Sequence, residues 1–153
     1  MSLLDSSEVE FEPEREVWNA YEVSDGTILR VRSLLLKLFR SNHAGPVPER
    51  RDPYSGRFQT VMNVKRTSAE LKGRRPERRL PLKELQNQPV VNEEFTAIDE
   101  GWNRYRLETG DLLKVKLVAT RIGRIEGSWD EFGDPLYAVS FVNVVQEIKK
   151  SQT

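Results

Sequence analysis

The sequence predicts an all-β fold: two tandem three-stranded meander repeats, packed as one pseudo-twofold small barrel or sandwich, with a long irregular connector. Three observations predict it: one stretch of the chain recurs 84 residues later, each copy carries the turn and alternation signals of β-strands, and the segment between the copies lacks periodicity. The predicted ranges are an acidic N-terminal arm at 1–16, a first β repeat at 17–66, a basic and polar connector at 67–100, and a second β repeat at 101–150, with both repeats in one domain.

The repeat is visible as "VWNAYEVSDGTILRVR" at 17–32, which returns as "GWNRYRLETGDLLKVK" at 101–116. The clearest matches at this offset (102 − 18 = 84) are Trp18 with Trp102, Asn19 with Asn103, Tyr21 with Tyr105, and Gly26 with Gly110. The ends of the copies also resemble each other around Asn63 and Asn143, at an offset of 143 − 63 = 80. Two packed copies of a small β unit explain such self-similarity, because an isolated meander buries little apolar surface.

Local signals in each copy favour strands. Gly26 and Gly110 stand where a tight hairpin turn needs a positive φ. Apolar and basic residues then alternate at 29–32 and 113–116, which predicts an apolar inner face and a basic outer face. Because the alternation slips afterwards, a bulge or sharp bend is expected near Ser33.

A helix is the alternative for "RSLLLKLFRS" at 32–41, since Leu and Lys are good helix formers. The second copy favours a strand, because its equivalent "KLVATRIGRI" contains β-branched Val118 and Thr120 before Gly123. After a turn-rich loop, a third strand is predicted at 57–65 in the first copy and at 136–148 in the second.

The segments outside the repeats carry weaker signals. The connector predicts a single turn through Leu71 and another short turn at 81–85. The N-terminal arm is expected to be ordered only if Val9 and Phe11 add to a sheet edge.

Composition narrows the class of protein. The 153 residues suffice for one domain with a real core, and 24 bases against 24 acids remove any global charge argument for nucleic acid or membrane binding. With no cysteine, disulfides and thiol catalysis are excluded, and no apolar run reaches the length of a membrane span. Because the acidic N-terminus lacks the pattern of a secretory signal, a cytoplasmic location is the default expectation.

Catalytic machinery is hard to find in this sequence. His43 is the only histidine, and neither common glycine-rich phosphate motif is present. Asp130, Glu131 and Asp134 cluster in one loop, where a solvated acidic turn is favoured over a hard-cation site. We therefore expect a non-enzymatic protein without a metal or cofactor.

Basic side chains are the most prominent candidates for binding. They are Arg30 and Arg32 in the first repeat, Lys114 and Lys116 in the second, and Arg74, Arg75, Arg78 and Arg79 in the connector. Together they suggest a footprint for phosphate backbones, as in small β-barrels that bind single strands. The recurring aromatics at 18, 21, 102 and 105 are more typical of a core than of base stacking, and acids such as Glu22, Glu77 and Glu108 weaken the field.

Protein recognition is the first functional expectation. A sheet edge, a proline-rich loop "GPVPERRDP" and a charged connector are parts from which interaction or assembly modules are made. The asparagines Asn19, Asn103, Asn63 and Asn143 are interpreted as structural, because Asn is disfavoured inside strands unless its amide is satisfied. The sequence thus predicts binding to a protein partner or self-association, with nucleic acid as the alternative and no membrane.

Overall fold

The computed structural model describes residues 6–41, 54–73 and 87–150. Its strands in the first half of the chain are β1 (Ser6–Glu8), β2 (Phe11–Arg15), β3 (Asn19–Val23), β4 (Ile28–Ser41) and β5 (Tyr54–Arg66). Those in the second half are β6 (Val90–Glu93), β7 (Phe95–Asp99), β8 (Trp102–Leu107), β9 (Leu112–Trp129) and β10 (Pro135–Ile148). These described residues contain no helix, so the prediction of an all-β fold is confirmed, and none of them forms a helix able to cross a membrane.

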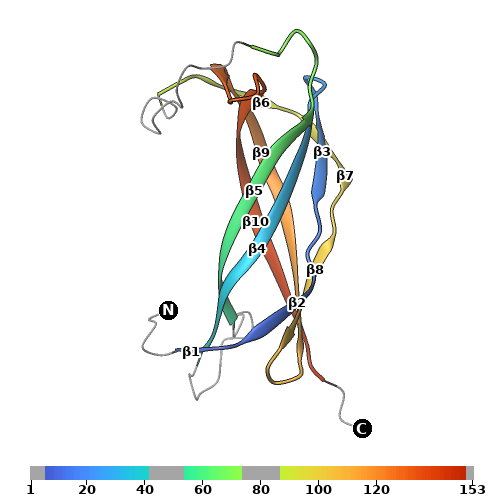
Figure 1. Ribbon diagram of the computed structural model, residues 1–153, viewed down its shortest axis with the longest axis vertical. Coiled ribbons are helices and arrows are strands. Elements are labelled where there is room, and N and C mark those ends of the chain that lie inside the picture. Colours follow the sequence, from blue (N-terminus) through green and yellow to red (C-terminus); the bar gives the residue numbers. More distant parts are fainter. Residues whose placement is uncertain (1–5, 42–53, 74–86, 151–153) are drawn as a thin grey trace.

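The strands form two antiparallel sheets of five strands each (Figure 1). In sheet A the order is β1-β4-β3-β7, and β5 also pairs with β4; in sheet B the order is β10-β9-β8-β2, and β6 also pairs with β9. Within the described residues neither sheet closes on itself, so the barrel, one of the two predicted arrangements, is wrong, and two open antiparallel sheets are found. The physical reason is that β5 and β10 each pair with one neighbour only in the described part of the chain.

The sheets exchange strands between the two halves of the chain. Strand β2 precedes the first copy but pairs with β8 of the second, and β7 precedes the second copy but pairs with β3 of the first. Phe11 of β2 packs edge-on against Tyr105 with ring centroids 5.6 Å apart, and Phe95 of β7 packs in the same way against Tyr21 at 5.9 Å. The segment that precedes each copy therefore adds a strand to the sheet that contains the other copy.

The consecutive strands β3, β4 and β5 run antiparallel beside one another, as do β8, β9 and β10. Gly26 and Gly110 close the hairpins with φ of 91° and 90°, and their N–H groups donate to the carbonyls of Val23 and Leu107 at 2.9 Å. Strand β4 covers the stretch for which a helix was the alternative. The hairpin and strand predictions are therefore confirmed.

The predicted position of the bulge is wrong. Ser33 and Leu35 are buried on the same face as Leu29, and beyond Leu29 the register with β5 shifts between Leu35 and Lys37, not at Ser33. Strand β9 shifts at the equivalent place, opposite residues 140 and 141 of β10. Leu35 must point inward because it packs in a core beside Tyr105, so the strand keeps its alternation past Ser33.

Four short strands were not predicted. The N-terminal arm contributes β1 and β2, and the segment expected to be an irregular connector contributes β6 and β7. Val9 is buried and Phe11 pairs with Leu107 of β8, which is the sheet-edge addition on which order in the arm was expected to depend. A turn at Leu71 is present, with its N–H donating to the Ser68 carbonyl at 3.1 Å, whereas the expected turn at 81–85 lies outside the described residues.

Two hydrophobic cores lie between the sheets, and each contains residues of both. The first core contains Val9, Leu35, Leu38, Tyr54, Tyr105, Leu107, Leu113 and Val115. The second core contains Tyr21, Val23, Leu29, Val31, Leu117, Ala119, Ile122 and Tyr137. The hairpin of one copy therefore packs against the far half of the long strand of the other copy, which ties the two sheets together.

Candidate interaction surfaces

Each repeated tryptophan lies beneath two basic side chains on the outer side of a sheet. The Arg30 guanidinium carbon is 4.7 Å from the centroid of the Trp18 ring, and that of Arg32 is 5.8 Å away. In the other sheet the ammonium nitrogens of Lys114 and Lys116 are 4.7 and 5.8 Å from the Trp102 ring. These cation–π contacts occupy the ring faces on which a nucleic acid base would stack.

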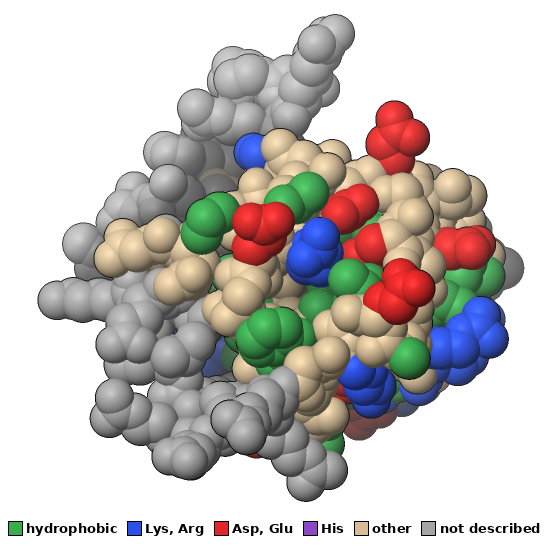
Figure 2. All heavy atoms as spheres, turned by 90° about the horizontal axis from the view of Figure 1, so that it is seen from above, with side chains coloured by type: hydrophobic (Ala, Val, Ile, Leu, Met, Phe, Trp, Pro, Cys, Tyr) green, Lys and Arg blue, Asp and Glu red, His purple; other side chains and the backbone are tan. Residues whose placement is uncertain are grey.

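Carboxylates lie beside these bases. Arg32 pairs with Glu16 at 3.8 Å, and Lys116 pairs with Glu100 at 3.7 Å. Figure 2 looks along the long axis onto one end of the molecule and shows acidic and basic side chains interspersed there. Local pairing of this kind lowers the positive field that phosphate backbones need.

The structure divides the predicted basic set. Arg30 and Arg32 lie on β4 of sheet A, and Lys114 and Lys116 lie on β9 of sheet B. The connector arginines Arg74, Arg75, Arg78 and Arg79 lie outside the described residues, as do His43 and the proline-rich loop. The four described members of the predicted basic set thus form two small clusters on separate sheets.

Two of the four predicted structural asparagines are buried between the sheets. Asn19 Nδ2 donates to the Leu117 carbonyl at 2.7 Å, and Asn103 Nδ2 donates to the Ser33 carbonyl at 3.0 Å. Their Oδ1 atoms accept the N–H groups of residues 101 and 17, respectively. Each amide therefore ties a strand of one copy to the chain of the other. Asn63 and Asn143 lie at exposed positions of β5 and β10 instead.

Two fully buried tyrosines extend these amide contacts. Tyr21 Oη donates to Glu100 at 2.8 Å, and Tyr105 Oη donates to Glu16 at 2.9 Å, while each Oη accepts from the asparagine of its own strand. Burial, followed by the hydrogen bond to Glu100, raises the pKa of Tyr21 to about 12. Burial and the bond to Glu16 likewise raise the pKa of Tyr105. Neither ring is accessible for stacking on a ligand.

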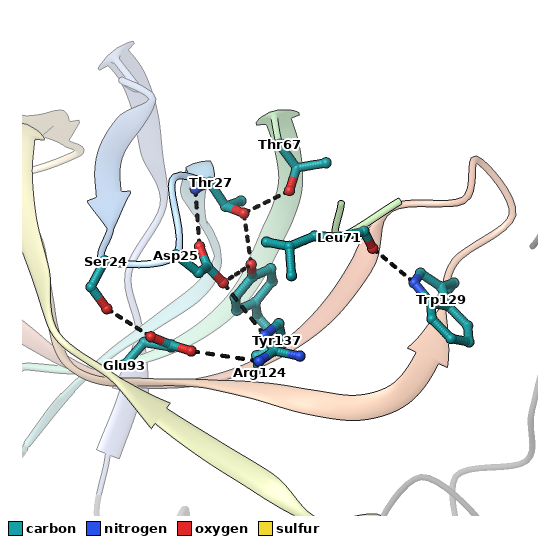
Figure 3. A network of polar contacts seen from close by, with 9 residues as sticks. All are labelled: Ser24, Asp25, Thr27, Thr67, Leu71, Glu93, Arg124, Trp129 and Tyr137. Carbon is teal, nitrogen blue, oxygen red and sulfur yellow. Dashed lines mark hydrogen bonds and ion pairs between the residues drawn. The ribbon is translucent and has the colours of Figure 1, made fainter. Parts of the chain in front are cut away.

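A third tyrosine centres a polar network that the sequence reading missed (Figure 3). Tyr137 Oη donates to Asp25 Oδ2 at 2.6 Å and also contacts Thr27 Oγ1 at 2.8 Å. Asp25 lies 3.6 Å from Nε of Arg124, whose Nη2 is 3.8 Å from Glu93. Burial, with the Asp25 bond, raises the pKa of Tyr137. Because its members come from β6, β9, β10 and the turn between β3 and β4, which are distant in sequence, no local pattern signals this network.

The acidic turn near residue 130 uses its carboxylates internally. Asp130 Oδ1 accepts the N–H groups of Phe132 and Asp134, at 2.8 and 2.9 Å. Asp134 in turn pairs with Lys72 at 3.1 Å. In the described ranges, no group of three or more histidine and acidic residues is arranged to hold a metal ion.

Strand β10 is the longest edge strand in the described part of the chain. It also carries exposed apolar side chains. Strand β10 pairs with β9 over its length, and the described residues place no strand on its other edge. The exposed fractions are 50% for Val142, 43% for Val144 and 40% for Ile148. Glu147 is the single charged residue in this strand. An edge of this kind offers main-chain donors and acceptors together with apolar contact.

Comparisons of the chain with protein-family models, with curated proteins and with solved structures found no match.

Proposed function

We propose that this protein is a non-enzymatic protein-interaction or assembly module, built as one pseudo-twofold domain from its two repeats. The interlocked sheets serve as a rigid scaffold, and binding takes place at the sheet edges and the adjoining outer faces. The observation that carries the proposal is the open edge of β10, with Val142 and Val144 exposed on the strand. Extended edges of this type add a strand from a partner through main-chain hydrogen bonds.

Reciprocal contacts support the pseudo-twofold arrangement. The bond from Asn19 to residue 117 has its counterpart in the bond from Asn103 to residue 33, because both members move by 84 positions (103 − 19 and 117 − 33). The same shift relates the Tyr–Glu bonds, the cation–π pairs and the exchanged strands β2 and β7. A duplicated unit whose halves complete each other explains why neither repeat carries a complete core.

Nucleic acid binding is the second candidate. Its specific support is the basic side chains that lie over the rings of Trp18 and Trp102. The glutamates beside Arg32 and Lys116 weigh against it, because they offset the charge that phosphate contacts require. The two candidates differ in their salt dependence, and one experiment therefore separates them.

The test measures solution mass with and without a random single-stranded oligonucleotide, at low and moderate salt. The matched variant replaces Arg30, Arg32, Lys114 and Lys116 by Gln. We expect the mass to be unaffected by the oligonucleotide in both proteins. A complex that weakens with salt and disappears in the variant would replace our proposal with nucleic acid binding.

Chemical cross-linking in an extract of the source cells tests protein recognition directly. The wild type is compared with an edge-blocked variant that carries Val61→Lys on β5 and Val142→Lys on β10, both at exposed positions. Cross-links, to itself or to another protein, that depend on the edges support the module. Their absence in the wild type, together with a monomeric mass, contradicts it.

A further inference from the structure

The long edge strands β5 and β10, one in each sheet, differ in how well they resist association. Strand β5 contains Arg57, Lys65 and Arg66 and no acid, whereas β10 contains one charged residue, Glu147. Charged side chains on edge strands, lysine above all, are a common device that prevents pairing with other chains. Strand β10 lacks that protection over 14 residues rich in β-branched and aromatic side chains. Such an edge is normally covered by a partner.

We infer that β10 pairs antiparallel with β10 of a second copy of this chain, joining two B sheets across a twofold axis. This inference rests on the proposed function and names the partner. A second copy is favoured by charge, because two β10 strands bring together only two carboxylates, whereas two β5 strands would bring together six positive charges (2 × 3). A twofold contact is also closed, so it limits assembly to a dimer.

The side-chain pattern of β10 indicates the register. A twofold axis perpendicular to the joined sheets keeps outer faces on one side, so outer residues of one copy must oppose outer residues of the other. An axis at Asn143 places Val142 opposite the partner's Val144, and each Val142–Val144 pair extends the row of exposed valines. It also leaves Glu147 opposite the partner's Val139, away from its own counterpart. The two Asn143 amides then face each other and can hydrogen-bond, which favours this register over neighbouring ones.

The first experiment measures the mass of the full chain by sedimentation equilibrium. We expect about 35 kDa for the wild type, twice the chain mass of 17.7 kDa. The double variant Val142→Lys, Val144→Lys is expected at the monomer mass, because four lysines would oppose one another across the axis. The control is Val61→Lys on β5, which is expected to remain dimeric. Circular dichroism and the thermal midpoint verify that each variant is folded.

The second experiment maps the register with single cysteines, which are unique because the chain has none. Asn143→Cys lies on the proposed axis and is expected to form an intermolecular disulfide on mild oxidation, since opposed residues in paired strands are within disulfide reach. Ser140→Cys and Gln146→Cys are expected not to cross-link to themselves, but to cross-link to each other when the two proteins are mixed.

Three outcomes overturn the inference. They are a monomeric wild type, a dimer that survives Val142→Lys with Val144→Lys, and disulfides that form elsewhere on β10 but not at residue 143. Failure here is distinguishable from failure of the proposed function: a monomer that still makes edge-dependent cross-links to another protein removes the self-pairing only. A monomer without such cross-links removes both.

Discussion

Truncation of Asn103 to alanine tests the ties between the two copies. The Asn103 side chain is 4% exposed, donates to the Ser33 carbonyl at 3.0 Å and accepts the Val17 N–H at 2.8 Å. Asn103→Ala leaves both backbone groups without these partners, and a buried polar group left unpaired costs about 1–3 kcal/mol. Ser33 is buried and Val17 is partly exposed, so we expect about 3 kcal/mol in total. For a chain of this size, the thermal midpoint should fall by about 6–12 °C.

The assay is urea unfolding followed by far-ultraviolet circular dichroism and tryptophan fluorescence. Asn19→Ala should lose the same amount within about 0.5–1 kcal/mol, because Asn19 makes the corresponding contacts to Leu117 and Gly101. Asn63→Ala on β5 is the control, since that exposed residue lies outside the proposed β10 contact and should change the free energy of unfolding by less than about 0.5 kcal/mol. A loss below about 1 kcal/mol in Asn103→Ala, or an equal loss in the control, would refute the reasoning.

Three further predictions concern a buried phenol, a docked segment and a turn. The pKa of Tyr21 is raised to about 12 while the unfolded phenol titrates near 10, so the contribution of Tyr21 to stability, about 3 kcal/mol, should be present below about pH 10 and be lost as the pH rises to about 12; Tyr21→Phe should remove this part of the loss from alkaline unfolding curves. Trp129→Phe removes the indole N–H bond to the Leu71 carbonyl and should speed tryptic cleavage at Lys72 with little change in the thermal midpoint, and an unchanged cleavage rate would contradict the docking. Gly26→Ala should lower the free energy of unfolding by about 1–2 kcal/mol, because a φ of 91° is unfavourable for alanine. No atom lies near the added methyl group, so the cost comes from the backbone alone, and a neutral result would mean that the turn adjusts.

The hairpins and long strands were predictable because their signals are local. The period-two alternation at 29–32 and the glycine before it require no knowledge of the rest of the chain. The bulge was misplaced because Leu35 is held inward by Tyr105, a residue 70 positions away (105 − 35). Strand β7 was missed, and the order of β2 could be expected only conditionally, for the same reason: each is short and partly polar, and it forms because a strand distant in sequence offers it an edge.

The candidate surfaces divide in a similar way. Sequence alternation places the four strand bases on outer faces, but only the tertiary structure stacks them on Trp18 and Trp102 and brings Glu16 and Glu100 beside them. The network around Tyr137 gave no sequence signal, because Asp25 and Arg124 reach it from different sheets. Its members are unremarkable in isolation, and their roles arise from proximity.

The sequence by itself determined that this protein is all-β, that a unit recurs after 84 residues, and that each unit turns at a glycine, because steric preference and side-chain alternation act within a few residues. Tertiary structure alone decided that the sheets remain open, that the two halves of the chain exchange β2 and β7, and that β10 presents an apolar edge. Those outcomes depend on which strand finds an unpaired neighbour and on which side chains fill a shared core, and such choices are made between residues far apart in the chain.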